Sequence, residues 1–548
     1  MKTLLNSWLE SPSYKLELQS IQSESDLEDR FHQLLPFGTA GMRGKLGAGT
    51  NRMNIHTVRL AAEGLARQIE AQGEMAKIRG VVIAYDTRHY SQPFAYETAG
   101  VLAAHGIQSY IFTESRPTPE LSFAVRYLAA VAGVVITASH NPKEYNGFKV
   151  YGSDGAQLIP EHVEEISAHM AKIDDLFSIS SRSYEQLIQS GLCEEILVKL
   201  DNAYNSSVQS LATVGTKSLS LVYTPLHGAG LVPTIRALRD AGFDRVHVVE
   251  EQAVQSGDFP TITYPNPEEA EAFLLAIELG EKVGADLLLA TDPDADRLGV
   301  AVRVDEHYEL LTGNQLGALL LNYLLETKPI QSNAAMVKTI VTSEFGAAIA
   351  EKYGVTTVNT LTGFKYIAEK IAEWTNSKEH TFIFGYEESY GYLAGDFVRD
   401  KDAVQIALLT AEMAAYYKVQ GNSIYAVLQK LYEEYGYFNE ALVSLTFEGA
   451  EGQEKIAAIM QQIRNNPPKQ LANIEVVKVE DYSTGLVNGL PSADVVKLLL
   501  ADGSWICIRP SGTEPKCKFY IGVEKSTKLA SEQAIEVLKA SLSDLYDI

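Results

Sequence analysis

The sequence predicts an α/β protein with three similar mixed α/β sheet domains and a smaller C-terminal α+β domain. Short apolar runs rich in Val and Ile recur through roughly the first four-fifths of the 548 residues, and each ends in Gly, Pro, Asn or Asp before a helical pattern begins. The runs are continuous rather than alternating, which is typical of strands buried on both faces of mostly parallel sheets. After residue 438 the pattern changes to antiparallel strands and a terminal helix, which indicates a domain of a different type.

These runs define the expected elements and domains. Strands are predicted at 81–84, 131–137, 219–223, 287–290, 337–342 and 382–384. In the C-terminal part, strands are predicted at 441–445, 505–508 and 517–521, and a helix at 531–545. We expect domains at residues 1–205, 206–312, 313–432 and 433–548.

Composition excludes several classes of protein. The formal charge of −24 would repel a polyanion, so nucleic acid is not an expected partner, although a locally basic cleft can still hold a small phosphorylated substrate. The first ten residues carry no signal peptide or membrane span, so we expect a cytoplasmic protein without a membrane partner. The three cysteines lack CxxC spacing, which argues against disulfides and thiolate zinc sites.

The first polar loop that carries chemistry follows the run at 131–137. It places the hydroxyl of Ser139 beside the imidazole of His140, before an Asn-Pro turn signal. Ligands of open α/β sheets bind at the carboxyl ends of strands, which favours a nucleophile here. A plain polar turn is the alternative, and the absence of GxSxG excludes a hydrolase nucleophile elbow.

The second loop follows the run at 287–290 and contains three alternating aspartates, Asp292, Asp294 and Asp296. Alternate residues of an extended chain point the same way, so these carboxylates are expected to converge on a cation. Oxygen ligands suit Mg²⁺ or Ca²⁺, and an EF-hand is excluded because its sixth and twelfth positions would be Arg297 and Arg303. Mg²⁺ is therefore the predicted ion, and a solvated acidic turn is the alternative.

Two further loops have weaker signals. Residues 385–391, which include Glu387, Glu388 and Ser389 between tyrosines, are suited to hydrogen bonding with sugar hydroxyls, and an exposed polar turn is the alternative. Residues 509–515 combine Arg509 with a Ser-Gly-Thr turn that could cradle an anion, and a plain hairpin loop is the alternative. Lys516 and Lys518 make this stretch basic in an acidic protein.

In this order, the four loops resemble the α-D-phosphohexomutase family, which includes phosphoglucomutases and phosphomannomutases. Further matches are Gly38-Thr39-Ala40-Gly41-Met42-Arg43-Gly44, Asp86-Thr87-Arg88, Gly147-Phe148-Lys149 and Thr362-Gly363-Phe364-Lys365. The GTAG segment and the chain length resemble the phosphoglucomutase and phosphopentomutase-like branch, so glucose, mannose and pentose all stay open as the preferred sugar.

The resemblance implies four domains around a central cleft, with one loop from each domain. It implies that Ser139 carries the phosphoryl group and that the three aspartates hold Mg²⁺. It implies that Glu387 and Ser389 read sugar hydroxyls and that the turn at 509–513 clamps the phosphate that is not transferred. The further catalytic residues it implies are Arg43, His140, Lys149 and Lys401. The remaining substrate-binding residues are Arg297, Thr362, Gly363, Arg509, Ser511, Gly512, Thr513 and Lys518.

The implied activity interconverts glucose 1-phosphate and glucose 6-phosphate, with glucose 1,6-bisphosphate as activator and intermediate, in a monomer or homodimer. A metal-dependent phosphatase that uses Ser139 is one rival, but a hydrolase does not require the distant anion cradle. A non-catalytic sugar-phosphate binding protein is another, but pure binding requires neither a nucleophile nor a metal. The sequence does not identify the residue that accepts the proton.

Overall fold

The structure is a computed structural model that describes residues 2–38, 41–212, 217–446, 449–510 and 516–546. The chain forms two compact units. The first consists of Met1–Thr312, Ala368–Asn376 and Ser389–Gln420, and the second of Gly313–Ile367, Ser377–Glu388 and Gly421–Ile548.

The first unit contains a seven-stranded mixed sheet in the order β1-β2-β6-β5-β3-β4-β7. Strands β3, β4, β5 and β7 run parallel, whereas β1, β2 and β6 add antiparallel pairs beside β5. The strands are β1 (Phe37–Gly38), β2 (Gly41–Lys45), β3 (Val81–Tyr85), β4 (Ser109–Phe112), β5 (Ala132–Ile136), β6 (Tyr145–Gly152) and β7 (Cys193–Ile196). Every residue of β3 and β5 is buried, because helices cover both faces of the sheet.

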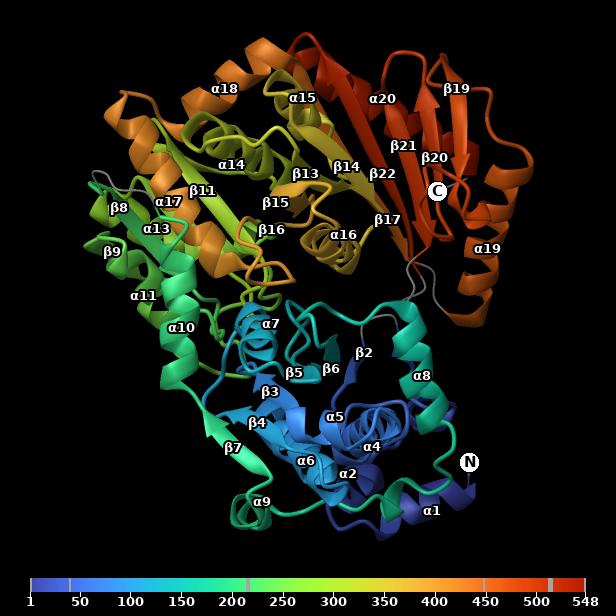
Figure 1. Cartoon of the computed structure of the whole chain (residues 1–548). Helices are drawn as coiled ribbons and strands as arrows, with labels where there is room; N and C mark the ends of the chain where they lie inside the picture. Colours follow the sequence, from blue (N-terminus) through green and yellow to red (C-terminus); the bar gives the residue numbers. More distant parts are fainter. Residues whose placement is uncertain (1, 39–40, 213–216, 447–448, 511–515, 547–548) are drawn as a thin grey trace. The chain divides into compact units, whose positions relative to one another are not determined.

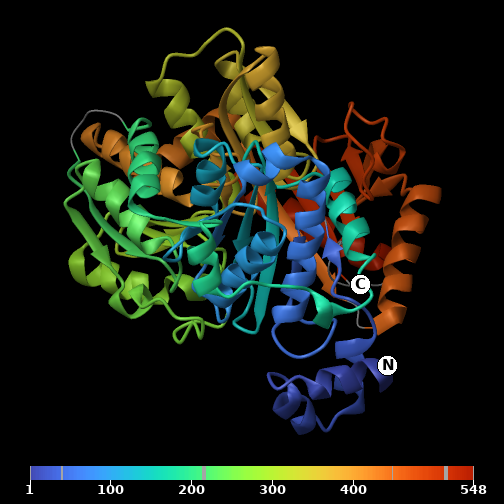
Figure 2. The ribbon, with the colours of Figure 1, turned by 60° about the horizontal axis from the view of Figure 1, so that its bottom comes forward.

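Helix α7 lies on one face of this sheet, and α4 and α6 lie on the other (Figures 1 and 2). Trp8 of α1 is fully buried in the same hydrophobic core. The helices are α1 (Lys2–Glu10), α2 (Lys15–Ser20), α3 (Glu24–Phe31), α4 (Ile55–Ala71), α5 (Glu74–Arg79), α6 (Ser91–Ala104), α7 (Thr118–Tyr127), α8 (Pro160–Met170), α9 (Tyr184–Ser190) and α10 (Val198–Gln209).

A second sheet of the first unit has the order β12-β11-β10-β8-β9. Strands β8, β9 and β10 are parallel, and the chain then turns back so that β11 pairs antiparallel with β10. The strands are β8 (Ser220–Thr224), β9 (Arg245–Val248), β10 (Leu287–Thr291), β11 (Leu298–Val304) and β12 (His307–Leu310). The helices of this region are α11 (Leu231–Asp240), α12 (Glu250–Ala253) and α13 (Leu274–Val283).

Helix α17 (Ala403–Val419) and the short strand β16 (Gly391–Leu393) also belong to the first unit. The helix packs on β10, β11 and α11, and it is apolar on almost all sides because nearly all of it is buried. Its N-cap is the fully buried Asp402, which accepts hydrogen bonds from the main chain of Val404 and Gln405 at 3.0 and 3.1 Å. The hydroxyl of Tyr204 in α10 donates to the same carboxylate at 2.8 Å.

The second unit begins with the parallel strands β13 (Ala334–Thr339), β14 (Thr356–Thr360) and β15 (Thr381–Glu387), with β13 in the middle. Around them lie α14 (Gly313–Thr327), α15 (Phe345–Lys352) and α18 (Ile424–Tyr435), whereas α16 (Phe364–Ser377) has residues in both units. All of β13 is buried.

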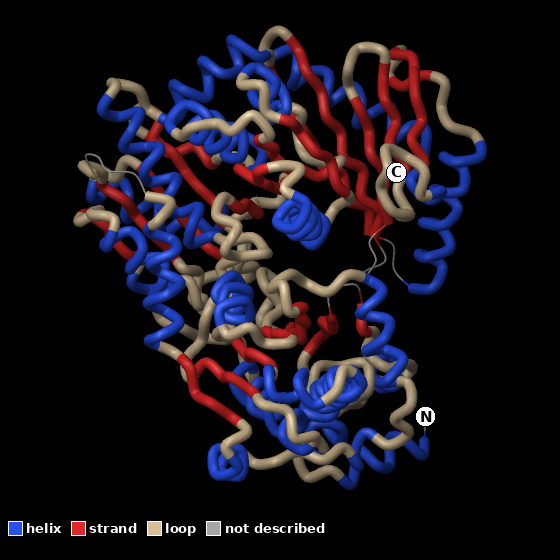
Figure 3. The backbone as a smooth tube through the Cα atoms, viewed as in Figure 1, coloured by secondary structure: helices blue, strands red, loops and turns tan. Residues whose placement is uncertain are grey.

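The C-terminal part of the second unit is an antiparallel sheet in which the ten-residue strands β17 and β22 pair along their whole length (Figure 3). The order is β17-β22-β21-β20-β19-β18. Its elements are β17 (Tyr437–Thr446), α19 (Gly449–Asn465), β18 (Gln470–Leu471), β19 (Ile474–Asp481), β20 (Val496–Leu500), β21 (Trp505–Pro510), β22 (Lys516–Lys525) and α20 (Lys528–Tyr546). Helix α20 packs against β17 and β22.

The predicted fold class of three mixed α/β domains and a C-terminal α+β domain is confirmed. The prediction of mostly parallel sheets is wrong for the first unit, because antiparallel strands follow the buried parallel ones in both of its sheets. The predicted strand at 337–342 instead ends at Thr339. Ile340 and Val341 are apolar because they pack from a turn against Trp505 and Tyr520. The domain boundaries stay a prediction, and none of the described helices could cross a membrane.

Asp402 should make the stability of the first unit depend on pH. Burial raises the pKa of its carboxyl from 3.8 to about 6, although its hydrogen bonds oppose the shift. The folded protein keeps this proton at pH values where the unfolded chain has lost it, so stability falls as pH rises from about 4 to 7. Asp402→Asn, which can still cap α17, should therefore lose about 1 kcal/mol of the pH dependence between pH 5 and 7.

Urea unfolding of the full chain at several pH values measures this difference. Asp396→Asn is the matched control, because it removes one carboxylate from an exposed position just before α17. Equal pH dependence in wild type and Asp402→Asn would contradict the assignment.

Candidate active site

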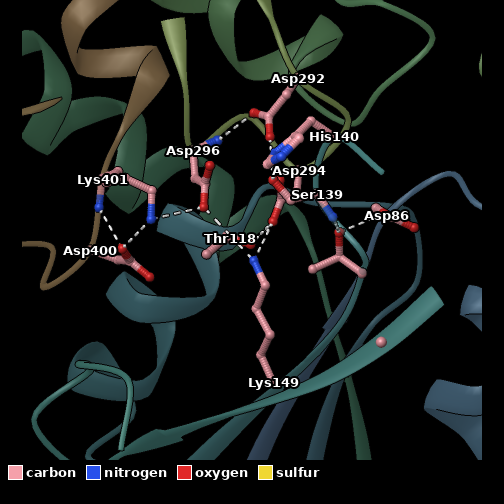
Figure 4. A network of polar contacts seen from close by, with 12 residues as sticks. Asp86, Thr118, Ser139, His140, Lys149, Asp292, Asp294, Asp296, Asp400 and Lys401 are labelled. Carbon is pink, nitrogen blue, oxygen red and sulfur yellow. Dashed lines mark hydrogen bonds and ion pairs between the residues drawn. The ribbon is translucent and has the colours of Figure 1, made fainter. Parts of the chain in front are cut away.

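Ser139 lies in the turn between β5 and β6, at the carboxyl end of a fully buried strand. Its φ of 52° is in the left-handed region, which is unfavourable for a residue with a Cβ. Its main-chain N–H donates to the hydroxyl of Thr137 at 2.8 Å. The side-chain hydroxyl donates to Asp292 at 2.6 Å and lies 3.1 Å from Nδ1 of His140 (Figure 4). The turn therefore presents one oriented hydroxyl to an imidazole and a carboxylate.

The three aspartates follow β10 and converge, with ligand atoms within 4.8 Å of one another and all three side chains buried. The expectation of an extended chain is wrong, because the segment folds into a turn. Ala295 has a φ of 48°. One oxygen of Asp292 accepts from the main-chain N–H groups of Asp296 and Arg297, both at 3.1 Å. The turn, rather than strand alternation, brings the carboxylates together.

Positive groups from distant segments reach this triad. Lys149 of β6 lies 2.8 Å from Asp294 and 3.8 Å from Asp296. Lys401, just before α17, lies 3.1 Å from Asp296 (Figure 4). Both ammonium groups are largely buried, so the ion pairs are poorly screened by solvent.

The two lysines do not fully neutralise the three carboxylates of the triad. Burial and the two neighbouring carboxylates raise the pKa of Asp292 well above its usual range. Burial also opposes ionisation of Asp294, but Lys149, together with hydrogen bonds from Asp292 and Thr118, outweighs it and lowers the pKa of that carboxyl. Among the described residues, one oxygen each of Asp294 and Asp296 is buried without a hydrogen-bond donor. Such oxygens fit a hard metal ion, which prefers carboxylate ligands.

His140, Arg43 and Arg297 surround the same serine. Burial, followed by the charges of Arg297 and Arg43, lowers the pKa of His140 well below its usual range, so its imidazole is neutral. Arg43 donates to the side chain of Asn141 at 2.9 Å, and Arg297 donates to Glu268. Ser389 belongs to the same unit and is half-buried in the turn before β16.

The remaining predicted residues lie in the second unit. One oxygen of Glu387 accepts from the main-chain N–H of Gly363 at 2.9 Å, and Thr362 is half-buried beside that glycine. Glu388 instead accepts from Thr342 at 3.1 Å. That Glu387 and the neighbouring loop residues bind sugar hydroxyls stays a prediction.

Arg509 and Lys518 are direct cross-strand partners in the antiparallel pair β21 and β22. Side chains of such partners lie on the same face, about 4.5–5.5 Å apart at Cβ, and like charges placed so are destabilising. A bound anion would relieve that repulsion. Ser511, Gly512 and Thr513, predicted to complete the cradle, lie outside the described residues.

Three supporting residues were missed by the sequence analysis. The Thr118 hydroxyl at the start of α7 donates to Asp294 at 2.8 Å, across 176 positions of sequence. Asp400 accepts from Lys401 at 3.1 Å and from Tyr151 at 2.7 Å, and Glu268 holds Arg297. No local sequence motif predicts these residues. Each acts on the site through another side chain, which is either distant in sequence or itself in contact with the triad.

Four family models match the chain in order. Phosphoglucomutase/phosphomannomutase alpha/beta/alpha domains I, II and III match residues 35–177, 201–305 and 312–435, and the C-terminal domain matches 460–540. The chain therefore belongs to the phosphoglucomutase/phosphomannomutase family.

Its relatives include a Staphylococcus epidermidis phosphoglucomutase, 41% identical over 94% of this chain and 96% of the relative. A Staphylococcus aureus phosphoglucomutase is 40% identical over 94% of this chain and 95% of its own. Among solved structures, the exocytosis-sensitive phosphoprotein parafusin from Paramecium, a phosphoglucomutase, superposes with a TM-score of 0.69 at 18% identity, covering 93% and 94% of the two chains. At this identity, the likeness to parafusin shows only that the two chains share a fold.

The triad should bind a divalent cation in the absence of substrate. Asp294→Asn removes an anionic ligand, and Thr118→Val removes the hydroxyl that orients this ligand. Loss of such an outer contact typically weakens metal affinity about 10- to 100-fold. Titration calorimetry with MgCl₂ measures both variants. Asp305→Asn, an exposed position between β11 and β12, is the control. Wild-type affinity in Asp294→Asn would contradict the metal site.

Proposed function

We propose that this chain is a Mg²⁺-dependent phosphoglucomutase that interconverts glucose 1-phosphate and glucose 6-phosphate through a phosphorylated Ser139. One observation carries the proposal: a serine hydroxyl lies 2.6 Å from a buried carboxylate that belongs to an electrostatically incomplete triad. Proximity of a nucleophile and a cation site is what phosphoryl transfer requires, since the protein mainly aligns groups and neutralises charge. The phosphoglucomutase relatives support glucose as the sugar.

The residues of the first unit would carry out the transfer of the phosphoryl group. Ser139 accepts and returns the phosphoryl group, and neutral His140 lies within reach of the hydroxyl proton. Asp292, Asp294 and Asp296 would hold Mg²⁺, which supplies positive charge to the oxygens of the transferring group. Lys149, Lys401, Arg43 and Arg297 add further positive charge around Ser139 and the triad.

The second unit would recognise the rest of the substrate. Glu387, fixed by the N–H of Gly363, accepts hydrogen bonds from sugar hydroxyls, together with Ser389 of the first unit. Arg509 and Lys518, with the turn between them, grip the phosphate that is not transferred. Because glucose 1,6-bisphosphate carries a phosphate at each end, it can be held in either orientation. Transfer of one phosphoryl group to Ser139 then leaves glucose 1-phosphate or glucose 6-phosphate as the product.

The alternatives make different demands. A phosphatase that uses Ser139 would not require the anion cradle at 509–513. A phosphomannomutase or phosphopentomutase would use the same transfer residues with another sugar. The monomeric or homodimeric state and the cytoplasmic location stay predictions from the sequence.

Activity on a panel of sugar 1-phosphates tests the function. Wild type with Mg²⁺ and catalytic glucose 1,6-bisphosphate should convert glucose 1-phosphate with a higher kcat/KM than mannose 1-phosphate or ribose 1-phosphate, and mass spectrometry should find phosphate on Ser139. Ser139→Ala should lose nearly all turnover while keeping its fold, because a turn hydroxyl adds little packing. Ser153→Ala, at an exposed turn, is the control. Full activity of Ser139→Ala would refute the mechanism.

Arg509→Ala separates the mutase from the phosphatase. Removal of a charge-assisted contact worth about 1.5–3 kcal/mol should lower kcat/KM for glucose 1-phosphate by roughly 10- to 100-fold. Phosphorylation of Ser139 by the bisphosphate should fall as well. Lys525→Ala, at the far end of β22, should leave both unchanged. If Arg509→Ala retains wild-type isomerisation, the anion cradle is wrongly assigned.

A further inference from the structure

Arg88 is a buried charge that lies outside the proposed chemistry. Its guanidinium is fully buried and donates to four main-chain carbonyl groups of one segment. These belong to Ser139 at 2.5 Å, Pro142 at 2.8 Å, Tyr145 at 3.1 Å and Asn141. All four lie on the turn that carries the serine or on its continuation into β6. One side chain therefore binds four carbonyl groups of this turn and its continuation.

Asp86 links Arg88 to the main-chain N–H of Ser139 through the side chain of Thr137. It pairs with Nε of Arg88 at 3.2 Å and accepts from the Thr137 hydroxyl at 2.6 Å. That hydroxyl in turn accepts from the main-chain N–H of Ser139 at 2.8 Å. Figure 4 shows Asp86 near Ser139, on the side away from the lysines. The N–H and the C=O of Ser139 are thus held by one connected network.

The network is closed to solvent by a segment of the domain that carries the aspartate triad. The ring of Phe259 lies over the Arg88 guanidinium at 4.9 Å and is 2% exposed. A Cβ on Gly257 would come within 2.5 Å of the His89 main chain, so the two segments approach closely. A buried guanidinium is costly unless it is paired, and here its two terminal nitrogens donate to the serine turn while Nε lies 3.2 Å from the carboxylate of Asp86.

We propose that Asp86 and Arg88 are positioning residues for phosphoryl transfer. They hold Ser139 in its left-handed conformation, so that its hydroxyl, and later its phosphate, is aimed at the aspartate triad. The proposal deepens the proposed function and rests on it. A merely structural role predicts a different result: the variants would contain less folded protein, but each phosphorylated molecule would turn over normally.

Two conservative variants test the network. Arg88→Lys keeps the charge but cannot reach four carbonyl groups, and Thr137→Val keeps the shape but removes the link between Asp86 and Ser139. His89→Gln is the control, because it removes a surface contact with Asp258 between the same two segments. For each protein we would measure Tm, the fraction phosphorylated on Ser139, KM, and kcat per phosphorylated molecule.

Loss of alignment should lower kcat per phosphorylated molecule by roughly 100-fold, as small misplacements of reacting groups do, with KM for glucose 1-phosphate little changed. The ratio of phosphoserine hydrolysis to transfer should rise, because water needs less alignment than a bound sugar. His89→Gln should match wild type in all four measurements.

The outcomes distinguish failure of the proposed function from failure of the positioning role. If wild type carries no phosphate on Ser139, the proposed function fails. If wild type is phosphorylated and active, but Arg88→Lys and Thr137→Val keep wild-type kcat and hydrolysis ratio per phosphorylated molecule, the positioning role is overturned, whatever their Tm values.

Discussion

The constraint on which the first unit depends is the burial of three carboxylates within 4.8 Å of one another. Such a cluster is unstable unless positive charge compensates it, because each ion has lost its water. The chain meets this demand from several places: Lys149 on β6, Lys401 before α17, and the hydroxyl groups of Thr118 and Ser139. Four segments far apart in sequence are thereby fixed around one point, and one of them carries Ser139, the proposed nucleophile.

Sheet topology explains why these contacts can be fixed so closely. The Ser139 turn joins β5 to β6 and the aspartate turn joins β10 to β11, and both strand pairs are antiparallel neighbours. Each turn is therefore tethered to its own sheet at both ends, unlike a loop that leads into a helix. Each of the two turns contains a residue with positive φ, Ser139 in one and Ala295 in the other. This conformation bends each turn so that its polar side chains face the triad. Strain of this kind persists only where the surroundings enforce it, as the Arg88 network does for Ser139.

The sequence was sufficient for the features that are local. Ser139, the aspartate triad and most strands follow from contiguous patterns, because a buried strand and the polar turn after it are adjacent in the chain. It was insufficient where a residue acts through a distant partner, as Thr118 does for Asp294. Local reasoning also failed where an apolar pair serves another purpose: Ile340 and Val341 look like strand residues but fill an interface with Trp505. The turn that brings the aspartates together was missed for a different reason: alternating aspartates after a strand predict an extended segment, whereas Asp292 accepts from the main chain of the residues that follow it.

The two proposed ligand sites share one electrostatic principle with opposite signs. The aspartate triad retains buried oxygens without donors, which favours a cation, whereas Arg509 and Lys518 oppose each other across a strand pair, which favours an anion. In each site, like charges lie close together, and a ligand of opposite charge would reduce their repulsion. A phosphoserine adds about −1.5 to −2 charges beside the triad, which the two lysines alone would balance poorly. A divalent cation held by the triad would therefore contribute most to charge balance when Ser139 carries a phosphate, although the three carboxylates favour a cation without it.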